Sequence, residues 1–235
     1  MQLVTGLFQS SLGKKIIMAI TGGLLFLFVI AHMLGNLQIF LGPEEINAYG
    51  HFLQSKLEIL WPARIGLLLA VGLHIWSAIQ VSAENQAARP VNYANDPTPV
   101  AASYASRTML MSGLIIATFI VYHLLHFTVQ IPALNFTGQD FKMLHDNKAR
   151  HDVFRMMVAG YQQPLVSGFY ILGMALLCLH LSHGVSAMFQ SLGLKNKTYG
   201  ALIDRFALGT AWIVFIGNCS IPIAVLCGFG KEALK

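Results

Sequence analysis

Five long stretches without a charged residue constrain what this chain can fold into. None of them contains Asp, Glu, Lys or Arg, and they cover residues 16–40, 65–83, 108–131, 164–190 and 206–229. Each has about the 20 residues that a helix needs to cross the hydrocarbon core of a bilayer. Helices are the economical way to cross, because every backbone polar group is then satisfied within its own segment. The sequence therefore predicts an all-α integral membrane protein with five spanning helices.

The composition supports this prediction and excludes several other classes. Hydrophobic residues make up 55% of the chain and charged residues 11%, and the mean hydropathy is +0.61. Soluble domains carry roughly 25% charged residues. A soluble enzyme, a disordered tail and a nucleic-acid binder are therefore excluded, despite the formal net charge of +5.

We expect a single transmembrane domain over residues 1–235. Trp61 and Pro62 mark the interfacial start of the second span, which we place at about 60–83. The first stretch is too long for the apolar region of a signal peptide, and we expect it to be retained. Lys and Arg number seven on one side and eight on the other, so the count does not orient the chain. The lysines close to helix ends favour a cytoplasmic N-terminus: Lys14, Lys15, Lys195 and Lys197.

The three cysteines each lie inside an apolar run: Cys178, Cys219 and Cys227. They form neither a C-x-x-C nor a C-x-x-C-H motif. We therefore expect no iron–sulfur ligand set, no covalent c-type haem attachment and no disulfide framework in this chain.

Six of the nine histidines lie inside the apolar stretches: His32, His74, His123, His126, His180 and His183. Ionisable residues within a bilayer are rare and costly, so each is a candidate for function. The alternative is a neutral histidine hydrogen-bonded between helices. The first four stretches each carry at least one histidine and the fifth carries none, which favours a shared role.

The depth of the histidines divides them into two pairs. His32 lies 17 residues after Lys15, and His123 lies 16 after Arg107, so both are roughly 25 Å along helices that start from one face. The second and fourth stretches run the other way.

The second pair lies closer to that face. His74 is ten residues before Glu84 and His180 is ten before Gln190, which puts both roughly 15 Å from it. Two imidazoles from different helices at one depth suit bis-histidine ligation of a planar tetrapyrrole. Two layers offset by roughly 10 Å suit electron transfer between two haems. Zinc or copper is less expected, because the ligands are divided between depths and no carboxylate or thiolate joins them.

Two local patterns accompany the pairs. Thr21-Gly22 and Ser112-Gly113 stand 11 and 10 residues before the first histidine of their own stretch. Small residues usually mean helix packing, and here they also leave room for a flat ring.

The remaining histidines have less specific expectations. His126 and His183 each follow a proposed ligand by three residues, so either member of a doublet could reach the iron. We expect them to be hydrogen-bonding groups or to lie on the propionate side. The other three are expected to be solvated: His51, His145 and His151.

Four motifs in order resemble a known family. They read S-S-L-G-K-K from Ser10 with M-A-I-T-G from Met18 and A-H-M-L-G-N-L-Q from Ala31; L-H at His74; Y-H at His123; and F-Y-I-L-G from Phe169 with L-H-L-S-H-G ending at Gly184. This series resembles the di-haem cytochrome b membrane anchor of succinate:quinone oxidoreductases and fumarate reductases. The resemblance covers essentially the whole chain and includes the five-helix count.

The resemblance implies a ligand set and partners. It implies that His123 and His180, rather than the histidines three residues later, are ligands. The haem nearer the cytoplasm would lie between His74 and His180, and the outer haem between His32 and His123. The chain would lie in a bacterial cytoplasmic membrane with its N-terminus inside. There it would dock a flavoprotein subunit with covalent FAD and an iron–sulfur subunit. Electrons would pass between succinate or fumarate and menaquinone, and the whole complex is compatible with a homo-oligomer.

One position departs from the family. Some di-haem fumarate reductases have a glutamate, proposed to conduct protons, two residues before the ligand of the fourth helix. Here that residue is Cys178. We therefore do not expect that proton path, and electron transfer to quinone near the outer haem would be electrogenic.

The quinone and propionate contacts are less well specified. Quinone reduction couples two electrons to two protons and needs a protonatable group, for which Glu58 and His51 are the candidates. Ordinary solvated loop residues are an equally good interpretation of both. Propionates seek cations at helix ends, and the candidates on the inner side are Lys14, Lys15, Arg107 and Lys195. Each could instead anchor its helix to lipid headgroups.

Other functions are less consistent with the sequence. A cytochrome b of a hydrogenase or formate dehydrogenase is disfavoured by one ligand on each of four successive helices. A cytochrome bc-type core would carry ligand pairs on single helices about 13–14 residues apart, and none occurs here. A histidine-lined transporter is disfavoured by the lack of carboxylates inside the spans.

Overall fold

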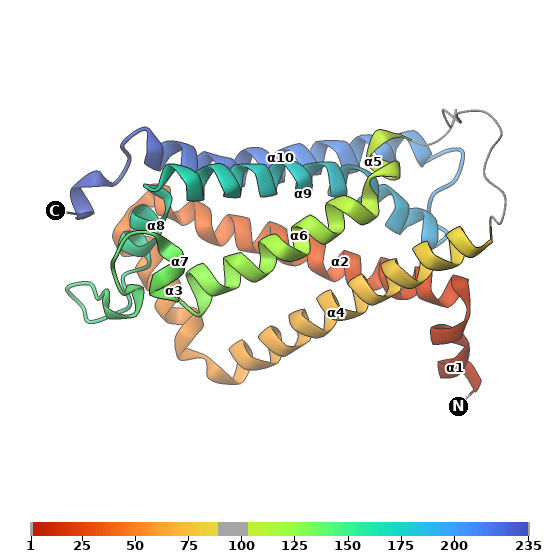
Figure 1. Ribbon diagram of the computed structural model, residues 1–235, viewed down its shortest axis with the longest axis horizontal. Helices are drawn as coiled ribbons and strands as arrows, with labels where there is room; N and C mark the ends of the chain where they lie inside the picture. The colour runs from red at the N-terminus through yellow and green to blue at the C-terminus, as the bar shows by residue number, and fades with distance from the viewer. Residues whose placement is uncertain (1, 89–102, 235) are drawn as a thin grey trace. The chain divides into compact units, whose positions relative to one another are not determined.

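The computed structural model describes residues 2–88 and 103–234 and contains no β-strand within them. Five helices are long and apolar enough to cross a membrane (Figure 1). They are α2 (Ser11–Asn36) with the 3-10 turn η1 (Leu37–Leu41), α4 (Leu57–Ala87), α6 (Met109–His123) with the π-helical turn η2 (Leu124–Thr128), α9 (Pro164–Ser191) and α10 (Gly200–Leu226). For the described residues, the prediction of an all-α protein with five helices long and apolar enough to span a membrane is confirmed.

The ends of the long helices differ from the predicted limits. α4 has 31 residues and includes charged residues at both ends. At a rise of 1.5 Å per residue it is about 46 Å long, which exceeds the roughly 30 Å hydrocarbon thickness. The third span ends at Thr128 rather than residue 131, because Gln130 has a left-handed backbone (φ 59°). The fifth ends at Leu226, shortly before Gly228 at φ 107°.

Short helices occupy segments that the sequence analysis treated only as ends and connections. They are α1 (Gln2–Gln9), α3 (Pro43–Ser55), α5 (Tyr104–Arg107), α7 (Pro132–Asn135), η3 (Phe141–Met143), α8 (Val153–Tyr161) and η4 (Lys231–Leu234). The middle of the predicted connection between the second and third spans, 89–102, lies outside the described residues.

The chain divides into two compact units. Unit 1 takes in Met1–Phe28, Ile65–Leu114 and Leu179–Ala211. Unit 2 takes in Val29–Arg64, Ile115–Cys178 and Trp212–Lys235. All five long helices contribute to each unit, which is therefore a bundle of helix segments from distant parts of the sequence.

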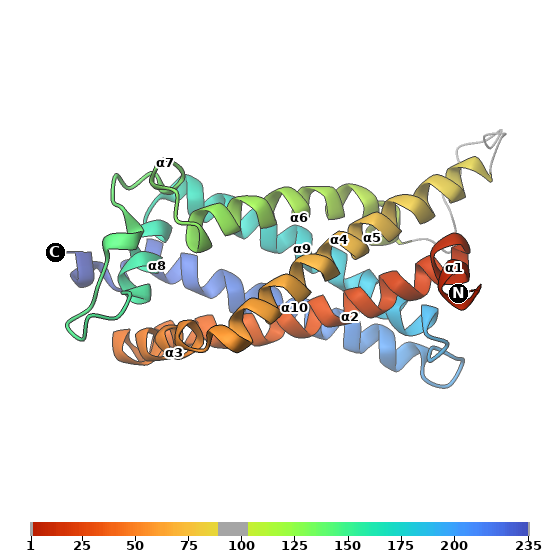
Figure 2. The ribbon, with the colours of Figure 1, turned by 90° about the horizontal axis from the view of Figure 1, so that it is seen from below.

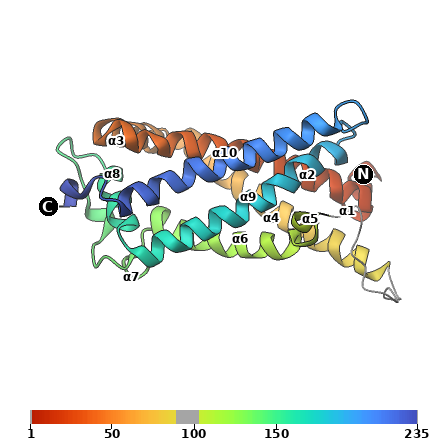
Figure 3. The same ribbon diagram turned by 90° about the horizontal axis from the view of Figure 1, so that it is seen from above.

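In unit 1, α4 lies against α2 (Figure 2), and α9 lies against α6 (Figure 3). The start of α10 joins this unit through a polar cluster. Lys195 Nζ lies 2.6 Å from Asp204 Oδ1, and the hydroxyl of Ser186 donates to the same oxygen at 2.5 Å. Ion pairs and hydrogen bonds thus hold the ends of the segments together.

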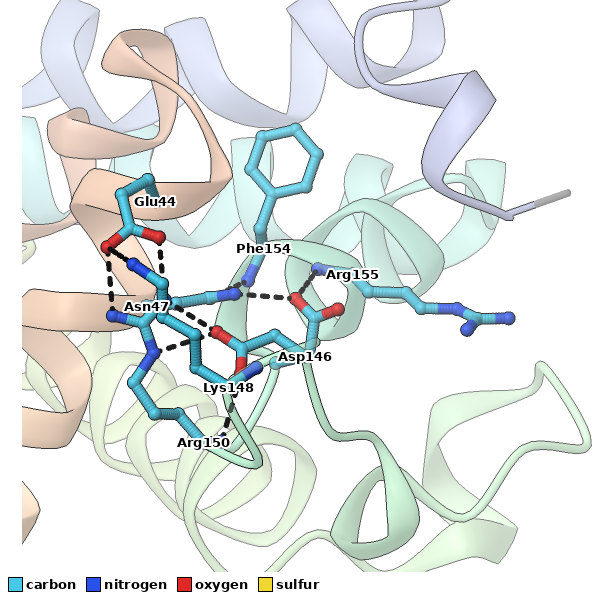
Figure 4. Close-up of polar contacts among 8 residues, drawn as sticks. Glu44, Asn47, Asp146, Lys148, Arg150, Phe154 and Arg155 are labelled. Carbon is cyan, nitrogen blue, oxygen red and sulfur yellow. Dashed lines mark hydrogen bonds and ion pairs between the residues drawn. The ribbon is translucent and has the colours of Figure 1, made fainter.

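Unit 2 has an apolar core with many aromatic side chains. Its buried members come from η1 and from five helices: Ile39, Ile46, Phe119, Phe154, Met157, Val158, Tyr161, Val166, Tyr170, Ile221 and Val225. The short helix α3 packs on α8 within this unit. Asn47 of α3 is 2% exposed, and its amide donates to Asp152 Oδ1 at 3.0 Å while its oxygen accepts the Phe154 N–H at 2.9 Å (Figure 4). This side chain therefore ties α3 to the first turn of α8.

A charged network also joins α3 to the loop before α8 (Figure 4). Glu44 accepts from Lys148 Nζ at 2.7 Å and from Arg150 at 2.8 Å, and Arg150 also bonds Asp146. The hydrogen bonds from Arg150 and Lys148 lower the pKa of Glu44 to about 2. Burial alone would raise the pKa of Asp146, but hydrogen bonds from Arg150 and Lys148 lower it to about 2. Both carboxylates are therefore ionised at neutral pH.

The outer surfaces of the long helices are apolar. More than half of each of these side chains is exposed: Leu24, Leu68, Leu172, Ile213 and Ile216. Such residues are unfavourable against water and favourable against lipid chains. The exposed residues therefore agree with helices that cross a membrane.

Candidate functional site: two pairs of histidines

Unit 1 brings together His74 of α4 and His180 of α9. The centroids of the two rings lie 6.3 Å apart, with an angle of 68° between the ring planes. This is one of the two pairs that the depth argument matched.

The protonation of His74 follows from its hydrogen bonds. The Thr21 hydroxyl donates to the carbonyl oxygen of Ile17 at 2.7 Å, so its single proton is committed. Thr21 Oγ1 lies 3.3 Å from His74 Nδ1 and can only accept from it. The carbonyl oxygen of Met18, 3.1 Å from the same nitrogen, is also an acceptor. His74 therefore carries its proton on Nδ1 and has a free lone pair on Nε2.

His180 has the same arrangement. The Ser112 hydroxyl donates to the Met109 carbonyl at 3.1 Å, and its oxygen lies 3.4 Å from His180 Nδ1. This hydroxyl is also an acceptor, which favours a proton on Nδ1. Histidines that bind a metal usually donate their other N–H to such a partner, which fixes the tautomer and the ring orientation. The chemistry of this pair therefore fits two Nε2 ligands.

Two glycines leave space for these rings. A Cβ at Gly22 would lie 3.0 Å from His74 Cε1, and a Cβ at Gly113 would lie 3.4 Å from His180 Cε1. The Thr-Gly and Ser-Gly pairs thus contact histidines of other helices. In the sequence the two dipeptides stand at matching distances before the histidines of their own helices, and this spacing does not show that they contact histidines of neighbouring helices. The repeated hydroxyl-glycine dipeptide was the available signal, but its partner helix could not be read from the sequence.

Unit 2 brings together His32 of α2 and His123, the last residue of α6. Their ring centroids lie 5.7 Å apart and their planes are perpendicular, at 90°. Phe119 stacks on His123 at 6.0 Å with 21° between planes, and Phe127 meets the same ring edge-on at 6.1 Å. The surroundings of this second matched pair are more aromatic than those of the first.

The polar contacts of this pair are different from those in unit 1. His123 Nδ1 lies 3.3 Å from the Tyr170 hydroxyl. His32 Nε2 lies 3.0 Å from Asn36 Nδ2, one turn further along the same helix. Ligation through His32 Nε2 would require the Asn36 amide to turn away. Tyr170 belongs to the F-Y-I-L-G motif, and its position in the sequence alone predicts no role for it.

Both ring separations are compatible with one metal ion between two imidazoles. A metal bound by one nitrogen of each ring at about 2 Å places the ring centroids about 6 Å apart. The observed values of 5.7 and 6.3 Å lie on either side of this distance. The donor set is two neutral nitrogens at each place, which suits haem iron with two axial histidines.

The two extra histidines have distinct positions. His126 lies in the π-helical turn η2 of unit 2 and is 0% exposed. Its Nδ1 lies 3.1 Å from the Tyr170 hydroxyl, and its Nε2 has no hydrogen-bond partner among the residues that the structure describes. His183 is half-buried on α9 in unit 1.

Two of the four cations predicted to face propionates form ion pairs with carboxylates of the protein. Lys14 is 7% exposed and forms an ion pair with Glu84. Lys195 pairs with Asp204. The other two candidates, Lys15 and Arg107, are exposed. Only Lys14 combines burial with a position on a helix that also supports a histidine of unit 1.

The quinone candidates and the loop histidines lie at the surface of unit 2. Glu58, His51 and His145 are exposed, and the described structure records no contact between Glu58 or His51 and the ring pair. His151 is half-buried, and its Nε2 lies 3.1 Å from Gln130 Nε2. Burial and the nearby His145 lower the pKa of His151, so the expectation of a freely solvated group does not hold for this residue.

The fold and the site together define a class: a helical protein with five candidate membrane spans and two separately built imidazole pairs. No family model, curated protein or solved structure matches the chain.

Proposed function

We propose that the chain is the membrane-anchor subunit of a succinate:quinone oxidoreductase or fumarate reductase and that it holds two haems b. The observation that supports this most strongly is the approach of four histidines, from four different helices, in two pairs at 5.7 and 6.3 Å. A histidine that only satisfies a packing contact has no reason to meet a second histidine, whereas axial ligation requires it.

Each histidine pair would hold one haem. His74 and His180 would hold the inner haem, and His32 and His123 would hold the outer haem. Bound haem supplies one-electron carrier chemistry. The chain itself orients three of the four imidazoles, His74, His180 and His123, through Nδ1 contacts and excludes water with apolar side chains, and both effects influence the reduction potential.

The remaining steps belong to partners and to the membrane surfaces. The N-terminus lies on the cytoplasmic side, where a flavoprotein with covalent FAD and an iron–sulfur subunit dock and carry the succinate chemistry. Menaquinone reacts near the outer haem, with Glu58 or His51 as the protonatable group. Cys178 is 9% exposed and occupies the position of the family's proton-conducting glutamate. A thiol is a much weaker acid than a carboxylic acid and is a poor substitute for it in that role.

The first test is a redox-resolved visible spectrum of the purified membrane complex, with pyridine haemochrome quantitation per chain. We expect two haems b per chain that titrate at two different potentials. A folded, membrane-inserted protein without haem would overturn the proposal, and transport of ions or protons would then be the function to test.

Partner capture separates the proposal from its nearest alternative. Purification through a C-terminal tag in mild detergent should recover a flavoprotein whose FAD remains attached after denaturation, together with succinate dehydrogenase activity. Two haems without either would instead indicate the cytochrome b of another quinone-linked dehydrogenase.

A further inference from the structure

A single hydroxyl group in unit 2 contacts two imidazoles. Tyr170 Oη lies 3.3 Å from His123 Nδ1 and 3.1 Å from His126 Nδ1. A phenol has one proton to donate, so it can donate to only one of the two nitrogens. The other contact is a hydrogen bond only if that imidazole donates its own N–H to the phenol oxygen. The two rings therefore have opposite tautomers.

The direction of the two hydrogen bonds of Tyr170 is determined if His123 binds iron. A ligand that uses Nε2 carries its proton on Nδ1, so His123 donates to Tyr170. Tyr170 then donates to His126 Nδ1, and the His126 proton is left on Nε2. That nitrogen is the one without a partner in the described structure. A protonated Nε2 cannot bind a metal. This explains why His123 can be a ligand while His126, three residues later, cannot.

Packing holds this arrangement in one geometry. Tyr170 is 4% exposed and meets Phe119 and Tyr161 edge-on, each at 5.1 Å. His126 stacks on Phe127 at 4.0 Å. The π-helical turn changes the rotation between His123 and His126 from the value in an α-helix, and such turns occur often at functional sites.

We infer that Tyr170 and His126 are positioning residues for His123: the phenol fixes its tautomer and ring plane, and His126 fixes the phenol. This inference rests on the proposed function, because it concerns an axial ligand. An imidazole that donates to an acceptor is a more basic ligand. A more basic ligand stabilises ferric over ferrous iron, so the contact lowers the reduction potential of the haem at this pair.

The test replaces the hydroxyl in the whole purified complex. In Tyr170→Phe, the ferric-to-ferrous ratio of the haem in unit 2, measured at a fixed potential, should fall about tenfold. For a one-electron couple this corresponds to a rise of about 59 mV in its reduction potential. The haem of unit 1 should keep its potential. The largest g value of the ferric low-spin signal, which depends on the angle between the two ligand planes, should change for one haem only.

Tyr122→Phe is the matched control. Tyr122 lies in the same aromatic cluster, at 6.0 Å from Tyr170 and 5.5 Å from His126, but its hydroxyl donates to the Leu134 carbonyl. Both potentials should remain unchanged in this variant. A merely structural role of the cluster would shift the potential in both tyrosine variants, and that result would overturn the inference.

A double-mutant cycle tests the role of His126. His126→Phe should shift the same haem in the same direction but less, and it should add nothing to Tyr170→Phe, because it acts through the phenol. His126→Gln, whose carbonyl can accept the Tyr170 proton, should restore a potential near that of the unchanged protein. Additive effects of the two changes would contradict the inference.

The outcomes separate this inference from the proposed function. Absence of haem from the unchanged protein removes the proposed function. If Tyr170→Phe binds two haems with unchanged reduction potentials, the proposed function stands and only the positioning role of Tyr170 is overturned. If Tyr170→Phe fails to fold, His126→Phe and His126→Gln decide: a shift that Gln reverses supports the role, and no shift overturns it.

Discussion

In unit 1 the two imidazoles bond to hydroxyls that neighbouring helices present, whereas in unit 2 His123 bonds to a phenol that it shares with His126. Thr21 and Ser112 each direct their proton to a carbonyl of their own helix, so each is a fixed acceptor. Within the part of the chain that the structure describes, the Tyr170 hydroxyl bonds to no backbone carbonyl and contacts a second histidine instead. Under the proposed function, the same requirement, a proton held on Nδ1, is therefore met by two different sets of contacts.

Under the proposed function, the difference between the two pairs has consequences for electron transfer. Haems with similar ligands but different hydrogen bonding and surroundings have different potentials. Unit 2 has an aromatic ring stacked on His123 and an Asn36 contact on His32, and the described residues of unit 1 place neither kind of contact on their pair. We therefore expect the two haems to be distinguishable in a single titration.

Removing one ligand from each unit should have the largest effect. His74→Ala and His123→Ala should each reduce the haem content from two per chain to one, because the two pairs share no residue. His183→Ala is the control for a half-buried histidine outside the pairs, and it should keep both haems. Pyridine haemochrome quantitation measures the result. Loss of both haems from either ligand variant would show that the two sites are not independent.

Adding a methyl group beside His74 should have the next largest effect. A Cβ at Gly22 meets the His74 ring at 3.0 Å, whereas a Cβ at Gly23 meets the flexible Met188 sulfur at the same distance. We expect Gly22→Ala to weaken haem retention at the unit 1 pair by about tenfold, the lower end of the usual effect of disturbing a ligand's support. Gly23→Ala should retain both haems, since Met188 can move. Equal losses in the two variants would mean that general packing, rather than the ring position, is responsible.

The ion pair in unit 1 provides a smaller test with its own neighbour as control. Lys14 is 7% exposed and pairs with Glu84, whereas Lys15 is exposed. Lys14→Met should lower the melting temperature of the solubilised protein by about 3 °C, a small fall because Lys14 is buried but its partner Glu84 is partly exposed and solvent screens the pair. Lys15→Met should leave it unchanged. A larger fall that disappears when haem is absent would assign Lys14 to a propionate instead.

The smallest effect is expected at the charged network of unit 2. Glu44 and Asp146 have pKa values lowered to about 2, against ordinary values of 4.5 and 3.8. A lowered pKa means that the network stabilises the loop above the ordinary values and loses this contribution as the pH falls toward 2. A carboxyl carbon NMR titration should find both values low, and Arg150→Gln should raise them toward the ordinary range.

The control for this titration is Lys142→Gln, in the same loop, which should leave both carboxyl pKa values low. The potentials of the unit 1 haem should not respond to either change. A change in the potential of the unit 1 haem would show that the two histidine pairs are not independent of each other.

Sequence reasoning predicted the spans and the pairing of depths but not the contacts of the rings. The position of His74 along its helix follows from counting residues at 1.5 Å each. Which neighbouring helix presents Thr21 to it depends on helix rotation and order, and the sequence contains no measure of either. The short helices α3 and α8 were missed because they are amphipathic and lie between longer apolar runs.

Tyr170 and His126 show a second limit. The sequence places both inside apolar stretches, where aromatic residues and histidines are compatible with ordinary packing. Their meeting requires the π-helical turn Leu124–Thr128, which changes the direction of every side chain after His123. Nothing in the composition of that segment distinguishes it from α-helix. The roles of all these residues in haem binding stay predictions.

The π-helical turn also affects how this helix can change by insertion or deletion. A turn closed by hydrogen bonds from residue i to i+5, such as Val129 N–H to Leu124 C=O at 2.7 Å, holds one residue more than an α-helical turn. A helix with such a surplus can lose a residue without breaking its backbone ladder, and everything beyond the turn then rotates by about 100°. A deletion of one residue from this turn would therefore change the direction of His126 and leave the contact of His123 with Tyr170 in place, while the same deletion within α6 would disrupt the packing of the span.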